Sequence, residues 1–287
     1  MKKISLLSIL TLLLITIASC SHSERYDARL FSVEVPDGLE PDEDSENNYT
    51  LINYVQLTDT ADNNTYVIMA FPFEGNPEAV LHNQTVGGGN PALAAMHYPA
   101  GRPEPFKFGR REGYEIAMSG VIEGIDVVGT GYCFNTDGCT FFVYNLTKEA
   151  TPDAKMSRKI IESISVNTEE IESYDAERLV EGVADMARLN IPLRIDELTT
   201  WSGITTDHNK REVVMVMTLD GEASDYAGID EHLASLRGAM VENLREGRDT
   251  DWLILVATEQ GYSLGYDYVL TDGTPLASLR VSPDEVK

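Results

Sequence analysis

Cys20 is the residue whose chemistry the sequence predicts most directly, because of the segment in front of it. Two lysines begin an almost unbroken apolar run from Ile4 to Ala18, and the small residue Ser19 follows. A basic start, a short apolar middle and small residues at the end are typical of a secretion signal. At a helical rise of 1.5 Å per residue the run spans about 22 Å, less than the roughly 30 Å hydrocarbon core of a membrane. Residues 1–19 are therefore predicted to be a cleaved signal and not a membrane span.

The four residues Ile17-Ala18-Ser19-Cys20 resemble the lipobox of bacterial lipoproteins. The resemblance implies attachment of a diacylglyceryl group to Cys20, cleavage before it, and export to the cell envelope. The alternative is an ordinary signal peptide followed by an incidental cysteine. Ser21 is not the aspartate associated with retention in the inner membrane of proteobacteria, so anchoring in the outer membrane is expected, with the periplasmic or surface face left open. Residues 20–26 would then be a lipidated tether.

Cys133 and Cys139 could form a disulfide after export, because compartments outside the cytosol are oxidising. They flank Phe134-Asn135-Thr136-Asp137-Gly138, which is typical of a hairpin turn. A five-residue loop would place the cysteines directly across from each other, whereas a type I turn with a glycine bulge would place Cys139 opposite Asn135, only diagonal to Cys133. The sequence leaves both geometries open. No histidine or further cysteine lies nearby, so a metal site is disfavoured and no cofactor is predicted.

Tyr262, Tyr266 and Tyr268 share one face of a predicted strand with Leu264 and Leu270, because all five occupy alternate positions. Such a ladder of tyrosines could be a binding face for a sugar, a peptide or a partner protein. The alternative is cross-strand packing underneath the helices of the same domain, and this alternative is favoured.

Thr60 is a candidate modification site. Asp59-Thr60-Ala61 resembles the O-glycosylation sequon used on exported proteins of Bacteroidota. The resemblance implies a glycan on Thr60, within a polar turn between two predicted strands.

No enzyme signature occurs in the sequence. It lacks the His-Glu-x-x-His, Cys-x-x-Cys and phosphate-loop motifs. A Gly-x-Ser-x-Gly nucleophile elbow is also absent, because the one match, at 261–265, falls at the start of a predicted strand and not on a strand-to-helix turn. Carboxylate pairs are too common among 47 acidic residues to indicate hydrolysis. The prediction is therefore a protein that is not an enzyme, and a hydrolase with an unrecognised site is kept as an alternative.

The chain is strongly acidic, with a formal net charge of −25. The charge becomes −27 if Lys2 and Lys3 leave with the signal, since no acidic residue leaves with them. Such a surface repels phosphate backbones, so no nucleic-acid partner is expected. Because 43% of the residues are hydrophobic and no long block of like charge occurs, the body is predicted to be folded.

The elements that position these residues are predicted to form two α+β domains, each an antiparallel sheet with helices packed mainly on one face. The first domain, 27–166, combines strands, an irregular middle, a three-strand meander and a helix that begins near Thr151. Its predicted strands are 29–36, 49–58, 65–73, 114–122, 127–135 and 139–146. This order, with Phe31-Ser32-Val33-Glu34-Val35-Pro36 at one end and the helix at the other, resembles the PsbP-like fold, whose members include photosynthetic accessory proteins and bacterial lipoproteins.

Residues 167–174 are polar and acidic, and they are expected to link the first domain to a second one at 175–287. The predicted helices there are 175–191 and 229–244, and the predicted strands are 198–205, 212–219, 252–258, 262–270 and 276–281. This order resembles cystatin-like α+β domains of uncharacterised exported bacterial proteins, in which Leu-Pro-x-x-Ile/Val-Asp-x-x-Thr follows the first helix. Ile191-Pro192-Leu193-Arg194-Ile195-Asp196-Glu197-Leu198-Thr199 stands in that place here. The resemblance implies a fold and no chemistry.

Two predicted strands, 213–217 and 252–257, are apolar at every position and not only at alternate ones. An antiparallel strand with one solvent-exposed face alternates apolar and polar residues, so both faces of these two strands are expected to be covered. The cover could be the first domain, another copy of the chain or a partner protein. Burial of a central strand inside its own domain explains the pattern equally well.

Taken together, these patterns predict a lipid-anchored envelope protein of the outer membrane. It is expected to act without catalysis, through contact with a partner protein or with further copies of itself. The alternative within the binding class is a glycan- or peptide-binding lipoprotein that uses the tyrosine face.

Overall fold

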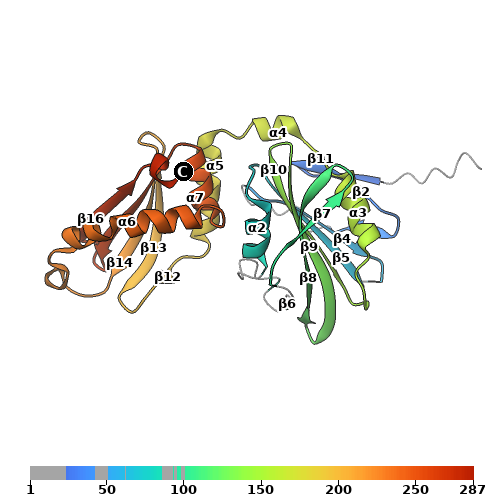
Figure 1. Cartoon of the computed structure of the whole chain (residues 1–287), viewed down its shortest axis with the longest axis horizontal. Helices are drawn as coiled ribbons and strands as arrows, with labels where there is room; N and C mark the ends of the chain where they lie inside the picture. The colour runs from blue at the N-terminus through green and yellow to red at the C-terminus, as the bar shows by residue number, and fades with distance from the viewer. Residues whose placement is uncertain (1–23, 43–50, 62, 86–92, 94–95, 98–100) are drawn as a thin grey trace, which may run out of the picture.

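The predicted α+β fold class is confirmed, and the chain forms an N-terminal and a C-terminal unit (Figure 1). The computed structural model describes residues 24–42, 51–61, 63–85, 93, 96–97 and 101–287. Cys20 and the predicted signal lie outside these residues. The first described strand, β1 (Glu24–Asp27), pairs with β2 (Phe31–Val35). The last part of the predicted tether is therefore held in a sheet.

Alternating segments of the N-terminal unit pair into one large antiparallel sheet of order β3-β4-β5-β10-β9-β8-β6, and β7 also pairs with β8. The strands are β3 (Leu39–Pro41), β4 (Asn53–Asp59), β5 (Asn64–Phe71), β6 (Met96–His97), β7 (Glu104–Phe108), β8 (Arg111–Ile122), β9 (Ile125–Thr136) and β10 (Cys139–Thr147). The short strand β11 (Ser165–Val166) pairs with β2, so the two ends of this unit meet in a second, three-stranded sheet.

The hairpin between β9 and β10 has a two-residue turn. Asp137 and Gly138 both have positive φ, at 50° and 82°. This is the geometry of a type I′ turn, which Asp-Gly favours because it matches the twist of the strands. The register places Cys139 opposite Thr136, three residues from Cys133. Both predicted turn geometries are wrong, and the odd separation puts the two thiols on opposite faces of the sheet.

Two helices cover the two faces of the large sheet. Helix α3 (Ala154–Ser163) buries Ile160 and Ile161 in the core on one face. Helix α2 (Pro77–Gln84) contacts β8 and β9 on the other face. Helix α2 was not predicted from the sequence. It begins after the N-cap residue Asn76, whose side-chain oxygen accepts hydrogen bonds from two backbone N–H groups.

The predicted linker contains a short helix, α4 (Thr168–Glu172), which leads into the C-terminal unit. The helices of that unit are α5 (Ala176–Arg188), the 3₁₀ turn η2 (Ala223–Tyr226), α6 (Ile229–Gly247), α7 (Trp252–Glu259) and α8 (Pro283–Val286). Its strands are β12 (Leu193–Arg194), β13 (Thr199–Asp207), β14 (Glu212–Leu219), β15 (Ser263–Leu270) and β16 (Pro275–Val281). The sheet has the order β12-β13-β14-β15-β16.

The prediction of a strand at 252–258 is wrong, because these residues form helix α7. Asp251 caps the helix by accepting hydrogen bonds from the backbone N–H groups of Leu253 and Ile254. Residues 253–258 are all buried, so the segment has no wet face from which a helical period could be recognised. With α6 and α7 both in the crossover, β14 and β15 run parallel, and they are the one parallel pair among the described strands.

Candidate functional site

The two units are packed together through α7. The indole of Trp252 lies against the rings of Phe71 and Phe73, with centroids 4.2 Å and 5.7 Å apart. Leu255 also faces Gly75 of the N-terminal unit, at 3.7 Å from where a Cβ on that glycine would lie. The apolar segment at 252–257 therefore does have cover from the first unit, as one of the alternatives predicted, although the segment is a helix.

Helix α5 also packs directly on the N-terminal unit. Leu51 is fully buried and packs on Gly182, where an added Cβ would lie only 2.3 Å from the Leu51 Cγ. A glycine is needed at this position because any side chain would overlap the leucine. A third contact is a hydrogen bond of 2.7 Å from the Asn83 side-chain amide to the carbonyl of Thr250.

A cavity of about 430 Å³ lies at this junction. Helix α2, helix α5, strand β13 and the start of α7 all contribute to its wall. Its described lining residues are Asn83, Gln84, Val183, Met186, Ala187, Asn190, Trp201, Thr250, Asp251, Trp252 and Leu253. The chain contains two tryptophans, and both line this cavity. Its volume falls within the roughly 300–1,000 Å³ of small-molecule sites, which often occur between domains.

The described lining of the junction cavity combines apolar and polar side chains, with Asp251 as its one charged residue. Its described residues include no lysine, arginine or histidine, and the carboxylate of Asp251 is engaged at the α7 N-terminus. Three carboxamides contribute donors and acceptors. Among the described residues, the side chains of Gln84 and Asn190 have no hydrogen-bond partner.

An exposed apolar segment lies next to the cavity. Seven large apolar side chains are exposed in the part of the chain that the structure describes, and four of them lie within ten residues. These four, called the apolar rim below, are Leu189 (69% exposed), Leu193 (46%), Ile195 (53%) and Leu198 (55%). Leu193 is paired with Trp201 in the β12–β13 register, so the rim adjoins the cavity wall.

Asp196 orders the turn that carries Leu198, the last residue of the apolar rim. Its carboxylate accepts hydrogen bonds from the backbone N–H groups of Leu198 and Thr199, at 2.8 Å and 2.7 Å. These two bonds hold the pKa of Asp196 below its usual value. The Asp-x-x-Thr part of the sequence motif is thus a turn that presents the rim, which agrees with a role in fold and not in chemistry.

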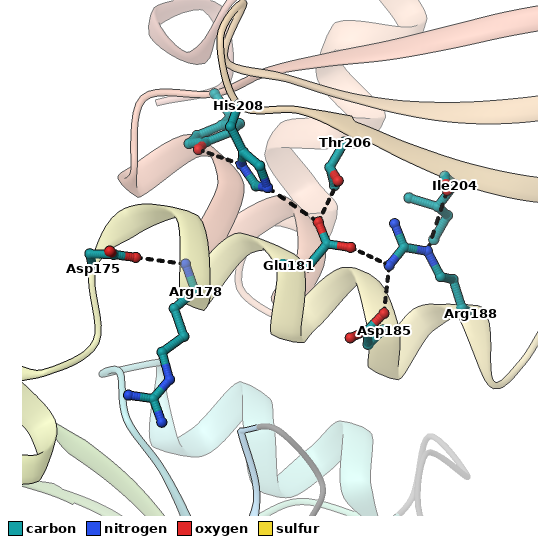
Figure 2. A network of polar contacts seen from close by, with 9 residues as sticks. Asp175, Arg178, Glu181, Asp185, Arg188, Ile204, Thr206 and His208 are labelled. Atoms are coloured by element: carbon teal, nitrogen blue, oxygen red, sulfur yellow. Dashed lines mark hydrogen bonds and ion pairs between the residues drawn. The ribbon is translucent and has the colours of Figure 1, made fainter.

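A network of polar side chains joins α5 to the β13–β14 hairpin (Figure 2). Glu181 accepts hydrogen bonds from the Thr206 hydroxyl and from Arg188, the latter at 2.6 Å. His208 lies 3.4 Å from the same carboxylate through Nε2, and its Nδ1 is 2.9 Å from the Tyr262 hydroxyl. Burial would raise the pKa of Glu181, but the bonds from Thr206 and Arg188 lower it below its usual value.

This order of carboxylate, imidazole and phenol resembles a proton relay, but it does not reach the junction cavity. Tyr262 is 1% exposed, and none of the three residues lines the junction cavity. We therefore assign the network of Glu181, His208 and Tyr262 to holding α5 on the sheet.

Of the three tyrosines of the predicted binding face, the structure closes Tyr262 to ligands and leaves Tyr266 and Tyr268 half-buried. Tyr262 is buried in the core, where its hydroxyl meets His208. Tyr266 is half-buried against the same core, and burial raises its pKa to about 12. Tyr268 is half-buried as well. The favoured alternative, packing, accounts for Tyr262, because its side chain lies beneath the helices and is closed to ligands.

The predicted disulfide is wrong, since Cys133 and Cys139 are both buried free cysteines. They belong to the cores on opposite faces of the sheet. Burial raises the pKa of both thiols, that of Cys139 to about 12, which makes them poor nucleophiles.

Thr60 is exposed in the turn between β4 and β5, so its hydroxyl is accessible, and its glycosylation stays a prediction. The carboxylate of the preceding Asp59 accepts hydrogen bonds from Asn63 and Asn64 and orders that turn. In the described residues, no cluster of histidine, cysteine or carboxylate side chains has the grouping of a metal site. No helix in the same residues is long and apolar enough to cross a membrane.

The sequence matches no protein-family profile and no curated protein. Among solved structures, a protein from Bacteroides thetaiotaomicron is similar over 82% of this chain and 76% of its own, with 11% identity and a TM-score of 0.38. The pilotin of the type 2 secretion system of Vibrio vulnificus is similar over 39% of this chain and 94% of its own (14% identity, TM-score 0.29). A Mycobacterium tuberculosis protein involved in cell-envelope biogenesis is similar over 52% of this chain and 87% of its own (16%, 0.30). At such scores, function has to be inferred from this chain's own residues.

Proposed function

We propose that this chain is a lipid-anchored envelope protein that acts without catalysis, by binding a partner protein on the apolar rim. The observation that carries the proposal is the group of four exposed leucine and isoleucine side chains between the end of α5 and the ordered turn at Asp196. Exposed apolar patches of this kind mark protein contact sites. Anchoring through Cys20 and location at the outer membrane follow from the lipobox resemblance and are part of the proposal.

The position of the rim suits a tethered protein. Strand β1, nearest to Cys20 along the chain, lies at one end of the molecule, and the C-terminal unit lies at the other end (Figure 1). A lipid on Cys20 would therefore hold the N-terminal unit near the membrane and the C-terminal unit, which carries the rim, farther from it.

The energetics of the rim define what the partner must supply. The four side chains are 46–69% exposed, so covering them removes about half of each from water. Full burial of such a side chain gains about 1.5–3 kcal/mol, so half of it gains roughly 1 kcal/mol per residue and about 4 kcal/mol in all. A micromolar complex requires about 8 kcal/mol. The partner must therefore contact further surface around the rim.

The charge of the chain favours a different protein over a second copy. Two copies would each bring a formal charge of −25 to the contact. Like charges oppose association, whereas a partner with an apolar strip and basic flanks would be attracted. Self-association in solution would contradict this part of the proposal.

Site-specific photo-crosslinking in cells tests the proposal. A crosslinker at Leu193 or Leu198 is expected to trap one partner in stoichiometric amounts, and a crosslinker at Val121, which is 51% exposed elsewhere, is expected not to. With the purified partner, the double variant Leu193→Ser and Leu198→Ser should weaken binding by about tenfold or more. The matched control, Val121→Ser with Ile125→Ser, should bind normally, and equal binding by all variants would rule out the rim.

The anchor is tested separately. Wild-type protein should incorporate radiolabelled palmitate and sediment with membranes, whereas Cys20→Ser should do neither. The Cys20→Ser protein should still bind the partner in solution, because the rim does not depend on the lipid. Wild-type material that stays unlabelled and unprocessed would refute the lipid anchor without affecting the rim.

A further inference from the structure

We propose that the junction cavity is a binding site for a neutral saccharide of one or two rings. This inference does not depend on the partner-binding role of the rim. It rests on the cavity between the units, and on the two tryptophans and three carboxamide residues that line it.

The polar groups of the cavity suit hydroxyl groups. The Asn83 amide donates one hydrogen bond to the Thr250 carbonyl, and its side-chain oxygen remains available as an acceptor. The side chains of Gln84 and Asn190 have no hydrogen-bond partners among the described residues. A carboxamide offers two donors and an acceptor, and each sugar hydroxyl both donates and accepts. The set can therefore satisfy several hydroxyls without any charge on the ligand.

The apolar part of the wall suits the other surface of a sugar ring. Trp201 and Trp252 come from different elements, β13 and α7, and the apolar residues Val183, Met186 and Leu253 line the same cavity. Trp201 is oriented by the bond from its Nε1 to the Gly203 carbonyl, at 3.0 Å. Indole rings combine a flat apolar surface with a polar edge, which matches the C–H face and the hydroxyl rim of a pyranose.

Charge excludes the other common classes of small ligand. An anion would enter a chain of formal charge −25 and find no lysine, arginine or histidine among the described lining residues. A cation would find only Asp251, whose Oδ1 already accepts the N–H groups of Leu253 and Ile254 at the positive end of a helix. A neutral ligand is the class that remains.

The site spans both units, so its occupancy should be coupled to their docking. Asn83 and Gln84 belong to the N-terminal unit, whereas Asn190 and Trp201 belong to the C-terminal unit. A ligand that contacts both sides binds only the docked arrangement and must stabilise it.

Tryptophan emission is a direct test, because both tryptophans line the cavity. The mature chain is titrated with maltose, cellobiose and N,N′-diacetylchitobiose, and in separate arms with trialanine and glucuronate, with calorimetry as a second readout. We expect at least one neutral disaccharide to shift the emission and raise the melting temperature, and glucuronate to do neither.

Matched amide variants locate the site. Asn190→Ala and Gln84→Ala should weaken disaccharide binding by roughly threefold to tenfold, which is the loss of one hydrogen bond. Asn209→Ala, which removes an exposed amide outside the cavity, should leave it unchanged. The inference is overturned if none of the disaccharides binds at about 10 mM, a concentration that detects affinities weaker than 1 mM. It is also overturned if binding is insensitive to Asn190 and Gln84, or if trialanine binds with the same variant pattern, which would make the cavity a peptide site.

Discussion

Replacing Gly182 by alanine tests the docking of the two units, because two effects of opposite sign compete there. In an exposed helix interior, Gly→Ala stabilises by about 1 kcal/mol, since alanine has the higher helix propensity. At Gly182, however, the new Cβ would lie 2.3, 2.7 and 2.8 Å from the Cγ, Cδ1 and Cδ2 atoms of Leu51. Rotation about χ2 of the leucine cannot relieve the overlap, because Cγ itself is too close, and Leu51 is fully buried, so rotation about χ1 would drive its side chain into other packed atoms.

The size of the destabilisation depends on how far the Cβ of the new alanine and the Leu51 side chain must move apart. Carbon atoms in favourable contact are about 3.5–4.0 Å apart, so α5 and Leu51 would have to separate by more than about 1 Å. Overpacking of this kind costs about 1–3 kcal/mol, which exceeds the gain in helix propensity. We therefore expect Gly182→Ala to lower the free energy of unfolding by about 1–2 kcal/mol.

Urea denaturation, followed by tryptophan emission and by circular dichroism, measures the effect. Gly238→Ala is the matched control, because Gly238 is in the interior of α6 and a Cβ there would meet nothing within 4 Å. The control should stabilise by about 1 kcal/mol.

A second substitution, at Leu51, tests whether the destabilisation by Gly182→Ala comes from the contact between these two residues. Leu51→Ala alone should cost about 2–5 kcal/mol, because it leaves a cavity in a fully buried position. In the Gly182→Ala background it should cost at least 1 kcal/mol less, since the alanine Cβ occupies part of that space, a coupling within the usual range of about 0.5–3 kcal/mol. If Gly182→Ala stabilises as much as Gly238→Ala and shows no coupling to Leu51, the two units are not docked in this way.

Three further outcomes are expected. Trp252→Ala should lower the free energy of unfolding by roughly 2–4 kcal/mol, slightly less than for a fully buried tryptophan, as measured by chemical denaturation. Ellman's reagent should find Cys133 and Cys139 unreactive in the native protein and both reactive in urea, and an intact mass that lacks two hydrogens would instead indicate a disulfide. Because the pKa of Glu181 is lowered on folding, its stabilising effect is present above the carboxyl pKa of the unfolded chain, about 4.3, and is lost as the pH falls through the lower folded value. Glu181→Gln should accordingly be less stable than wild type at pH 7 and similar to it near pH 3, and an equal deficit at both pH values would contradict the assignment.

Much of the secondary structure could be predicted because apolar positions recur with a helical or strand period, or because Gly-containing turns mark the ends of the strands. The hairpin strands β9 and β10 and the helices α5 and α6 lie close to their predicted ranges. Helix α7 was missed for the opposite reason: it is buried on all sides, and a short apolar run has no period that separates a helix from a strand. Helix α2 is only eight residues long and follows an Asn-Pro start, a signal that could have located it.

The predictions for the candidate site residues were incomplete for a similar reason. The alternation of Tyr262, Tyr266 and Tyr268 correctly placed them near one face, but alternation does not say what lies on top of that face. The spacing of Cys133 and Cys139 predicted a hairpin, and the φ values at Asp137 and Gly138 then decided the register. In each case a local pattern was compatible with several surroundings, and only packing selected one.

By itself the sequence determined the α+β class, the acidic charge and the candidate address at Cys20, because these depend on composition and on neighbours along the chain. Only the tertiary structure decided that Leu51 meets Gly182, that both tryptophans line one cavity, and that the leucines from 189 to 198 stay exposed. The reason is that the first two features join segments far apart in sequence, while the exposure of the rim depends on which other parts of the chain pack on it; both depend on how complete surfaces fit together.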